Sequence, residues 1–140
     1  MNKMWAFLLF VLPLVLSQLL PSTGAVDRIA KEVPLMRKEL PDVPGKEGLI
    51  ETVVFSPGEV VPSHRHNADV FAYVLEGTIL TQLKGGKPQI VHSGEVFYES
   101  PTDLHVASRN TSNTKPAKLL VFFVKKTGAV STVPAVNTAH

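Results

Sequence analysis

The chain of 140 residues contains no cysteine, and aromatic residues make up 7% of it, with a single tryptophan. Without cysteine the protein has no disulfide to stabilise its fold, and it lacks the acceptor that a lipoprotein anchor needs. Its stability must therefore come from a buried apolar core. Hydrophobic residues make up 44% of the chain, which is sufficient for such a core.

Clustered charge of one sign is also missing. The 14 lysine and arginine residues nearly balance the 12 acidic residues, and the formal net charge is +2 at pH 7. Lys125 and Lys126 form a pair rather than a patch. A nucleic-acid partner would require a clustered positive face, so we expect none.

The first 25 residues have the features of an export signal. Lys3 is the only charged residue among them, an apolar run extends over Met4–Leu20, and small residues end at Ala25. Cleavage after Ala25 would release residues 26–140 to the periplasm or the medium, with no membrane association afterwards. Pro13 interrupts the run and makes it a poor permanent span; an uncleaved anchor is the alternative.

The remaining chain is long enough for one domain and too short for two. Residues 26–47 combine prolines with mixed charges, which predicts an extended N-terminal arm without a long helix. A single domain is expected over residues 48–127, and residues 128–140 are expected to form a loose or edge segment as a C-terminal tail.

Short runs of β-branched and apolar residues, separated by turn residues, fill the predicted domain. Several antiparallel strands with this spacing indicate an all-β sandwich or barrel. The expected strands are residues 49–55, 70–75, 78–83, 89–91, 95–98, 104–106 and 118–124.

Three histidines form the most informative pattern. His64 and His66 are two positions apart on a segment expected to be extended, so their side chains point to one face, and His105 on a later strand can close on them. This arrangement predicts a three-histidine site for one divalent transition metal, without distinguishing iron, zinc, copper, nickel or manganese. Alternatively, His64 and His66 are surface residues of a turn. His92, beside a turn, is interpreted as solvated rather than ligating.

These residues resemble the first motif of the cupin family, which consists of a glycine, a His-x-His pair and a second glycine. Gly58, His64, His66 and Gly77 stand at the expected spacings, and a proline before the histidines, here Pro62, is also typical.

A second cupin motif is matched more loosely by Gly94, Pro101, His105 and Asn110. One extra residue separates its glycine from its histidine, and Asp103 stands where a second glycine is usual. The resemblance covers roughly residues 46 to 125. It implies a cupin-type jelly-roll β-barrel of short antiparallel strands, and because such barrels often dimerise, a homodimer is expected.

The sequence departs from the family at Val70, where a metal-binding glutamate is usual. Some cupin dioxygenases are similar in using three histidines, so the metal hypothesis does not depend on this glutamate. If regular strand alternation holds, residues 64, 66 and 70 share one face and Asp69 points away. For Tyr98 and Glu99, on opposite faces of one strand, the sequence leaves open which of them faces inward. The candidates for a replacement oxygen ligand are Asp69, Glu76, Tyr98 and Glu99.

Functions from different classes then compete. The first is a metal-dependent oxygenase, or an isomerase or lyase, acting on a small molecule in the barrel. Glu99 is its candidate general acid or base, and Arg109, four residues after His105, could share the inward parity of His105 and hold a substrate carboxylate. The second is a noncatalytic barrel that binds a metal or small ligand outside the cytoplasm, and the third is an interaction module with a vestigial site. An open, partly apolar pocket would favour catalysis, whereas a closed site with four protein ligands would favour storage or structure.

Overall fold

The computed structural model describes residues 30–135, in which the regular structure consists of strands and no helix occurs. Every strand pairing in this range is antiparallel. The all-β class expected from the sequence is confirmed. The expected export signal lies outside the described residues, as do the last five residues of the tail.

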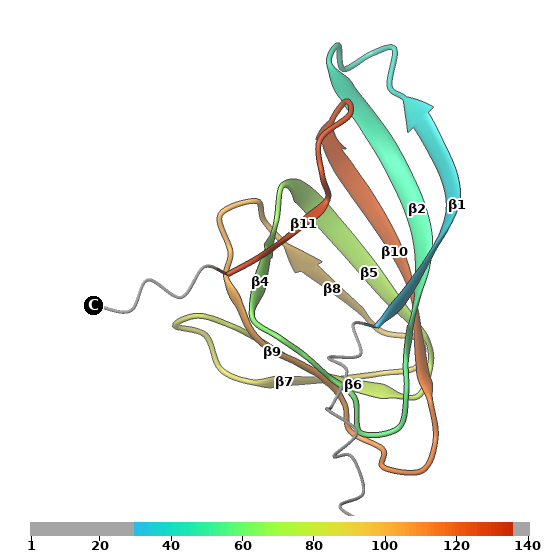
Figure 1. Cartoon of the computed structure of the whole chain (residues 1–140), viewed down its shortest axis with the longest axis vertical. Coiled ribbons are helices and arrows are strands. Elements are labelled where there is room, and N and C mark those ends of the chain that lie inside the picture. The colour runs from blue at the N-terminus through green and yellow to red at the C-terminus, as the bar shows by residue number, and fades with distance from the viewer. Residues whose placement is uncertain (1–29, 136–140) are drawn as a thin grey trace, which may run out of the picture.

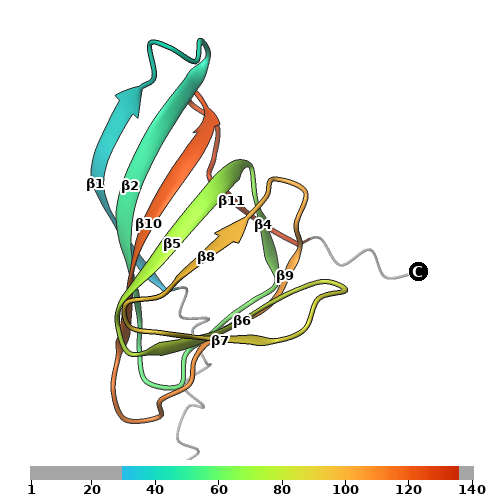
Figure 2. The ribbon, with the colours of Figure 1, turned by 180° about the vertical axis from the view of Figure 1, so that it is seen from behind.

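The strands form two sheets that face each other, as Figure 1 and the reverse view in Figure 2 show. The first sheet has the order β1 (Lys31–Glu39), β2 (Lys46–Phe55), β10 (Ala117–Lys126), β5 (Ala68–Glu76) and β8 (Val96–Glu99). The second has the order β11 (Thr132–Pro134), β4 (His64–His66), β9 (His105–Asn110), β6 (Thr78–Leu83) and β7 (Gln89–His92), and β3 (Val60–Val61) also pairs with β9.

Both ends of the described chain add edge strands to the barrel. Residues 31–39, expected to be part of an extended arm, form β1 and pair with β2 along their length, with a register shift between Pro34 and Met36. A proline is tolerated here because β1 is an edge strand, with no neighbour on its other side among residues 30–135. In the tail, residues 132–134 form β11, which pairs with β4 and so brings the tail beside His64 and His66.

Alternation along residues 64–74 defines the inner face of the barrel. Positions 64, 68, 70, 72 and 74 are buried, whereas 65, 67, 71 and 73 are exposed, because successive strand side chains point to opposite faces. The inner residues join a core that includes Leu49, Phe55, Val70, Val74, Ile79, Leu119 and Phe123. The outer face of the first sheet keeps Phe71, Tyr73 and Tyr98 exposed. This face is compatible with the expected homodimer, which stays a prediction.

Asn110, the last matched residue of the second motif, has a structural role. Its side chain is 1% exposed, and its amide donates hydrogen bonds to the carbonyls of Ser56 and Lys115. Its side-chain oxygen accepts from the backbone N–H of Ser112. Asn110 therefore ties two loops together at one end of the barrel. Separately, no helix within residues 30–135 is long and apolar enough to cross a membrane.

Candidate metal centre

The three predicted histidines meet on the inner face of the second sheet. His64 on β4 lies directly opposite His105 on β9 in the strand pairing. The ring centroid of His64 is 4.9 Å from that of His66 and 4.9 Å from that of His105, and the remaining pair is 6.0 Å apart. We call these residues the imidazole cluster. Local alternation brings His64 and His66 to one face, and the pairing of β4 with β9 adds His105.

Two of the rings are oriented by hydrogen bonds at Nδ1. His64 Nδ1 lies 2.8 Å from the carbonyl oxygen of Pro62; because a carbonyl accepts, this nitrogen carries the proton and Nε2 keeps a free lone pair. His66 Nδ1 lies 3.0 Å from Thr132 Oγ1 on β11. Such partners behind a ring set its direction and tautomer in metal sites. Burial also lowers the pKa of His64, against the hydrogen bond to Pro62, which raises it. The neutral form that a metal requires is therefore favoured.

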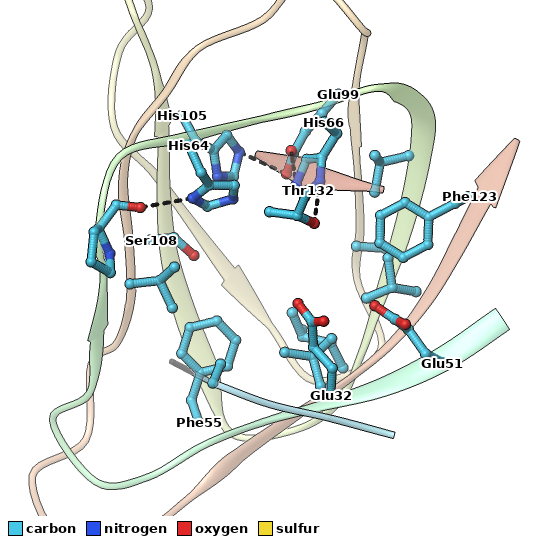
Figure 3. Close-up of a pocket in the computed structure, with 18 of the residues that line it drawn as sticks. Glu32, Glu51, Phe55, His64, His66, Glu99, His105, Ser108, Phe123 and Thr132 are labelled. Carbon is cyan, nitrogen blue, oxygen red and sulfur yellow. Dashed lines mark hydrogen bonds and ion pairs between the residues drawn. The ribbon is translucent and has the colours of Figure 1, made fainter. Parts of the chain in front are cut away.

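Glu99 supplies a carboxylate to the imidazole cluster. One of its oxygens is 2.7 Å from His105 Nε2 and the other is 3.2 Å from His66 Nε2, as the dashed lines in Figure 3 indicate. The residue is 3% exposed. Burial by itself would raise the pKa of Glu99, but the hydrogen bonds from His105 and His66 outweigh burial and lower it to about 2. Glu99 is therefore ionised at neutral pH.

The donor types fit a divalent transition metal, since three imidazoles and one carboxylate are ligands that such ions accept. As the side chains lie, however, the carboxylate of Glu99 is hydrogen-bonded to the imidazoles of His66 and His105. Within residues 30–135, no group of three or more His, Cys, Asp or Glu side chains has its atoms arranged around a common ion position. The hydrogen bonding is nevertheless incomplete, because His105 Nδ1 is buried and has no hydrogen-bond partner in the described part of the chain. A metal would be held by His64, His66, His105 and Glu99.

The cluster opens onto a cavity of about 520 Å³ between the two sheets. Figure 3 shows the imidazole cluster and Glu99 on one side of this cavity and Phe55, Glu32 and Glu51 on the other. Much of the lining is apolar, and its contributors include Val53, Val61, Val70, Phe97, Leu119 and Phe123. The cavity is therefore suited to a small organic molecule rather than to an ion alone.

The other predicted oxygen ligands lie away from the cluster. Tyr98 and Asp69 are on the outer face of the first sheet, where the tyrosine hydroxyl donates to the Asp69 carboxylate at 2.7 Å. Glu76 is exposed at the end of β5. Val70 faces inward as expected and is 2% exposed. Of the four candidates, Glu99 is the one that reaches the imidazoles.

Arg109 does not reach the cavity. Arg109 could share the face of His105 only if the alternation along β9 were unbroken. The pairing with β6 instead shifts register at this point, with Leu83 opposite His105 and Gln82 opposite Ala107. The extra residue reverses the alternation, so Ser108 is buried and Arg109 is exposed.

Three residues at the cavity were not identified from the sequence. Thr132 comes from the tail, where nothing in the pattern pointed to the site. Glu51 and Glu32 come from the two strands at the start of the described chain. A signal existed for Glu51, because it is the one acidic residue within the apolar run of residues 49–55 and shares the parity of Leu49 and Phe55.

Several solved structures have a similar fold. The DMSP lyase DddQ from Ruegeria pomeroyi DSS-3 is 19% identical over 66% of this chain, with a TM-score of 0.56. An oxalate oxidase in complex with glycolate is 25% identical over 62% of this chain, with a TM-score of 0.53. The present chain spans 45% of the length of each of these two proteins. A cupin superfamily protein from Desulfitobacterium hafniense DCB-2 is 14% identical over 71% of this chain and 80% of its own, with a TM-score of 0.57.

A search of curated proteins found no match. The family model described as "Cupin domain", in contrast, matches residues 51–123, which is more than half of the chain. This range contains the three histidines and Glu99. Together with the two antiparallel sheets, the match shows that the chain belongs to the cupin family.

Proposed function

We propose that this protein binds one divalent transition metal through His64, His66, His105 and Glu99 and acts as an oxygenase on a small organic molecule in the adjacent cavity. One observation carries the proposal: three imidazoles and a buried carboxylate converge on the wall of an apolar cavity of about 520 Å³. The similar oxalate oxidase structure holds a small organic molecule, glycolate.

The residues of the chain have distinct roles in this proposal. Pro62 and Thr132 orient the rings of His64 and His66 from behind. Glu99, ionised at neutral pH, offsets part of the charge of the ion, a role that suits it better than that of a general base. Val70 and Phe123 keep water from the space beside the cluster. A bound redox-active ion would supply the oxygenase chemistry.

The number of protein ligands bears on the identity of the metal. Four donors complete a tetrahedral site, as structural zinc prefers, whereas an octahedral ion such as ferrous iron or manganese keeps two positions for other ligands. The oxygenase proposal therefore requires an ion that takes more than four ligands. The fourth donor, Glu99, is also the observation that favours a second function, a noncatalytic barrel that holds a metal or a small ligand.

Metal content and turnover separate these functions. The purified protein is stripped with a chelator, reconstituted separately with iron, manganese, copper, nickel and zinc, and analysed by elemental analysis beside His64→Ala and His92→Ala. The exposed His92 lies outside the cavity, so its variant is a matched control. We expect about one equivalent of metal in the protein and the control, and a large loss in His64→Ala. Equal retention in both variants would exclude the proposed site.

Oxygen uptake is then measured with small phenols, diketones and flavonoid-like compounds. Uptake that depends on the reconstituted metal and is lost in His64→Ala supports the oxygenase. Stoichiometric metal without uptake under any of these conditions supports the binding barrel instead.

Export is a separate part of the proposal. The apolar run over Met4–Leu20, with small residues ending at Ala25, supports secretion followed by cleavage. N-terminal sequencing of the protein from the periplasm or the medium should begin at Val26. A cell-associated product that begins at Met1 would contradict this part and leave the metal site unaffected.

A further inference from the structure

Glu51 is a buried carboxyl group on the side of the cavity opposite the imidazole cluster. It lies in the middle of β2, paired with Pro34 on β1 and with Val121 on β10. The residue is 3% exposed, and one carboxyl oxygen, Oε1, is buried and has no hydrogen-bond partner among the residues that the structure describes. Within the described part of the chain it forms no ion pair. A buried polar group without a partner is costly, so its presence at this position calls for an explanation.

Glu32 on β1 adds a second carboxylate beside Glu51. It is exposed at the rim but lines the cavity, and Figure 3 shows both side chains on the side that faces the imidazole cluster. We call Glu32 and Glu51 the acidic pole. Among the described residues that line the cavity there is no lysine or arginine.

The charged surroundings of Glu51 are sparse. Burial first, and then the charge of Glu32, raise the pKa of Glu51 to about 7, while the charges of His66 and Arg37 lower it to a smaller extent. The pairing strand β10 places the apolar Val121 opposite it. Within residues 30–135 no cationic side chain forms an ion pair with Glu51, and a cation from a ligand would favour its ionised form.

Ligands of three kinds are conceivable at the acidic pole, and the geometry separates them. A second metal ion would need more donors, and no third His, Cys, Asp or Glu completes a ligand group there in residues 30–135. A neutral hydroxyl could pair with Glu51 but would gain little from the charge of Glu32. A protonated amine gains from both carboxylates and also from aromatic rings, since Phe55 and Phe123 line the same cavity.

We infer that the acidic pole binds the protonated amine of a small ligand whose other end lies at the imidazole cluster. This inference goes beyond the proposed function, because amine recognition at Glu51 needs no metal. It also predicts that the cavity discriminates against ligands that carry a carboxylate at this end, since two carboxyl groups would face it.

The test uses benzylamine and benzyl alcohol, two probes with the same ring that differ in charge. Their affinities for the metal-free full-length protein are measured at pH 8 by NMR titration. We expect benzylamine to bind roughly tenfold more tightly or better, since hydrogen bonds to charged groups exceed neutral ones by this order. In Glu51→Gln this preference should fall severalfold, and the part that remains is due to Glu32. Glu76→Gln, which removes an exposed carboxylate outside the cavity, should keep it.

A second readout needs no variant. The carboxyl carbon of Glu51, followed by ¹³C NMR, should titrate at a lower pH once benzylamine is bound. Equal affinity for the two probes, no benzylamine binding up to its solubility, or an unchanged preference in a folded Glu51→Gln protein would each overturn the inference. Because metal is absent throughout, none of these results depends on the outcome for the metal site.

Discussion

Glu99 lies directly opposite Val70 in the antiparallel pairing of β8 with β5. Val70 occupies the position where the cupin motif usually has its glutamate, and in this chain the carboxylate lies on the neighbouring strand and lines the same cavity. Cross-strand partners have Cβ atoms about 5 Å apart, which is short enough for a glutamate on either strand to reach the imidazoles. We therefore expect that a glutamate at either position could serve the imidazole cluster.

Exchanging the two side chains tests this relationship. Glu99→Val should weaken metal binding by roughly tenfold or more, because an anionic ligand is lost. The double variant Val70→Glu, Glu99→Val should recover most of the affinity, measured as the dissociation constant in a competition assay with a chelator. Asp69→Asn, which removes a carboxylate from the outer face, is the control. Unchanged affinity in Glu99→Val would mean that Glu99 is not a ligand.

Thr132 tests the contribution of the C-terminal segment to the metal centre. Thr132→Val keeps the shape of the side chain but removes the hydroxyl that pairs with His66 Nδ1. We expect metal affinity to fall by about tenfold, since the partners behind ligating histidines typically contribute this much. Thr132→Ser should stay close to the parent protein. If the valine variant binds metal as tightly as the serine variant, the hydroxyl does not orient His66.

Glu51 should make the metal-free protein less stable as pH rises. Its pKa is raised from 4.5 to about 7, so the folded state holds a proton that the unfolded state releases between these values. The stabilising effect of this proton is present below pH 4.5 and is lost as pH approaches 7. The free energy of unfolding should fall by up to about 3 kcal/mol over this range.

The measurement is the free energy of unfolding in urea, compared between the parent protein and Glu51→Gln at several pH values. The comparison is needed because His64 affects stability with the opposite sign. Its pKa is lowered, so its contribution to the free energy of unfolding increases with pH. As pH rises toward 7, the free energy of unfolding of the parent protein should fall relative to that of Glu51→Gln. Parallel curves would show that the pKa of Glu51 is close to its ordinary value.

Alanine substitutions at Gly77 and Gly85 distinguish the cost of backbone strain from the cost of steric crowding. Both have positive φ angles, +80° and +82°. A Cβ at Gly77 would lie 2.8 Å from the Cβ of Ala117, whereas one at Gly85 would meet nothing within 4 Å. Gly85→Ala should cost about 1 kcal/mol from the backbone alone, and Gly77→Ala roughly 1–3 kcal/mol more from overpacking. Chemical denaturation measures both, and equal losses would contradict the crowding at Gly77.

Much of the fold was predictable because it depends on local alternation. The inward direction of His64, His66 and Val70 was predicted correctly, since their spacing by even numbers survives across β4 and β5. The strand expected at residues 78–83 has these bounds in the structure. Local alternation gives the wrong face for Arg109, because one extra residue in β9 reverses the direction of every later side chain. No local feature of the sequence indicates this extra residue.

The sequence by itself determined the family, the succession of short strands and the three histidines, since motif spacing and side-chain periodicity are properties of neighbouring residues. Tertiary structure alone decided that Glu99 rather than Tyr98 faces the imidazoles, that Thr132 supports His66, and that Glu51 stands across the cavity. These relationships join strands that are distant in sequence. Their register is set by how the two sheets pair and pack as a whole, which no local pattern specifies.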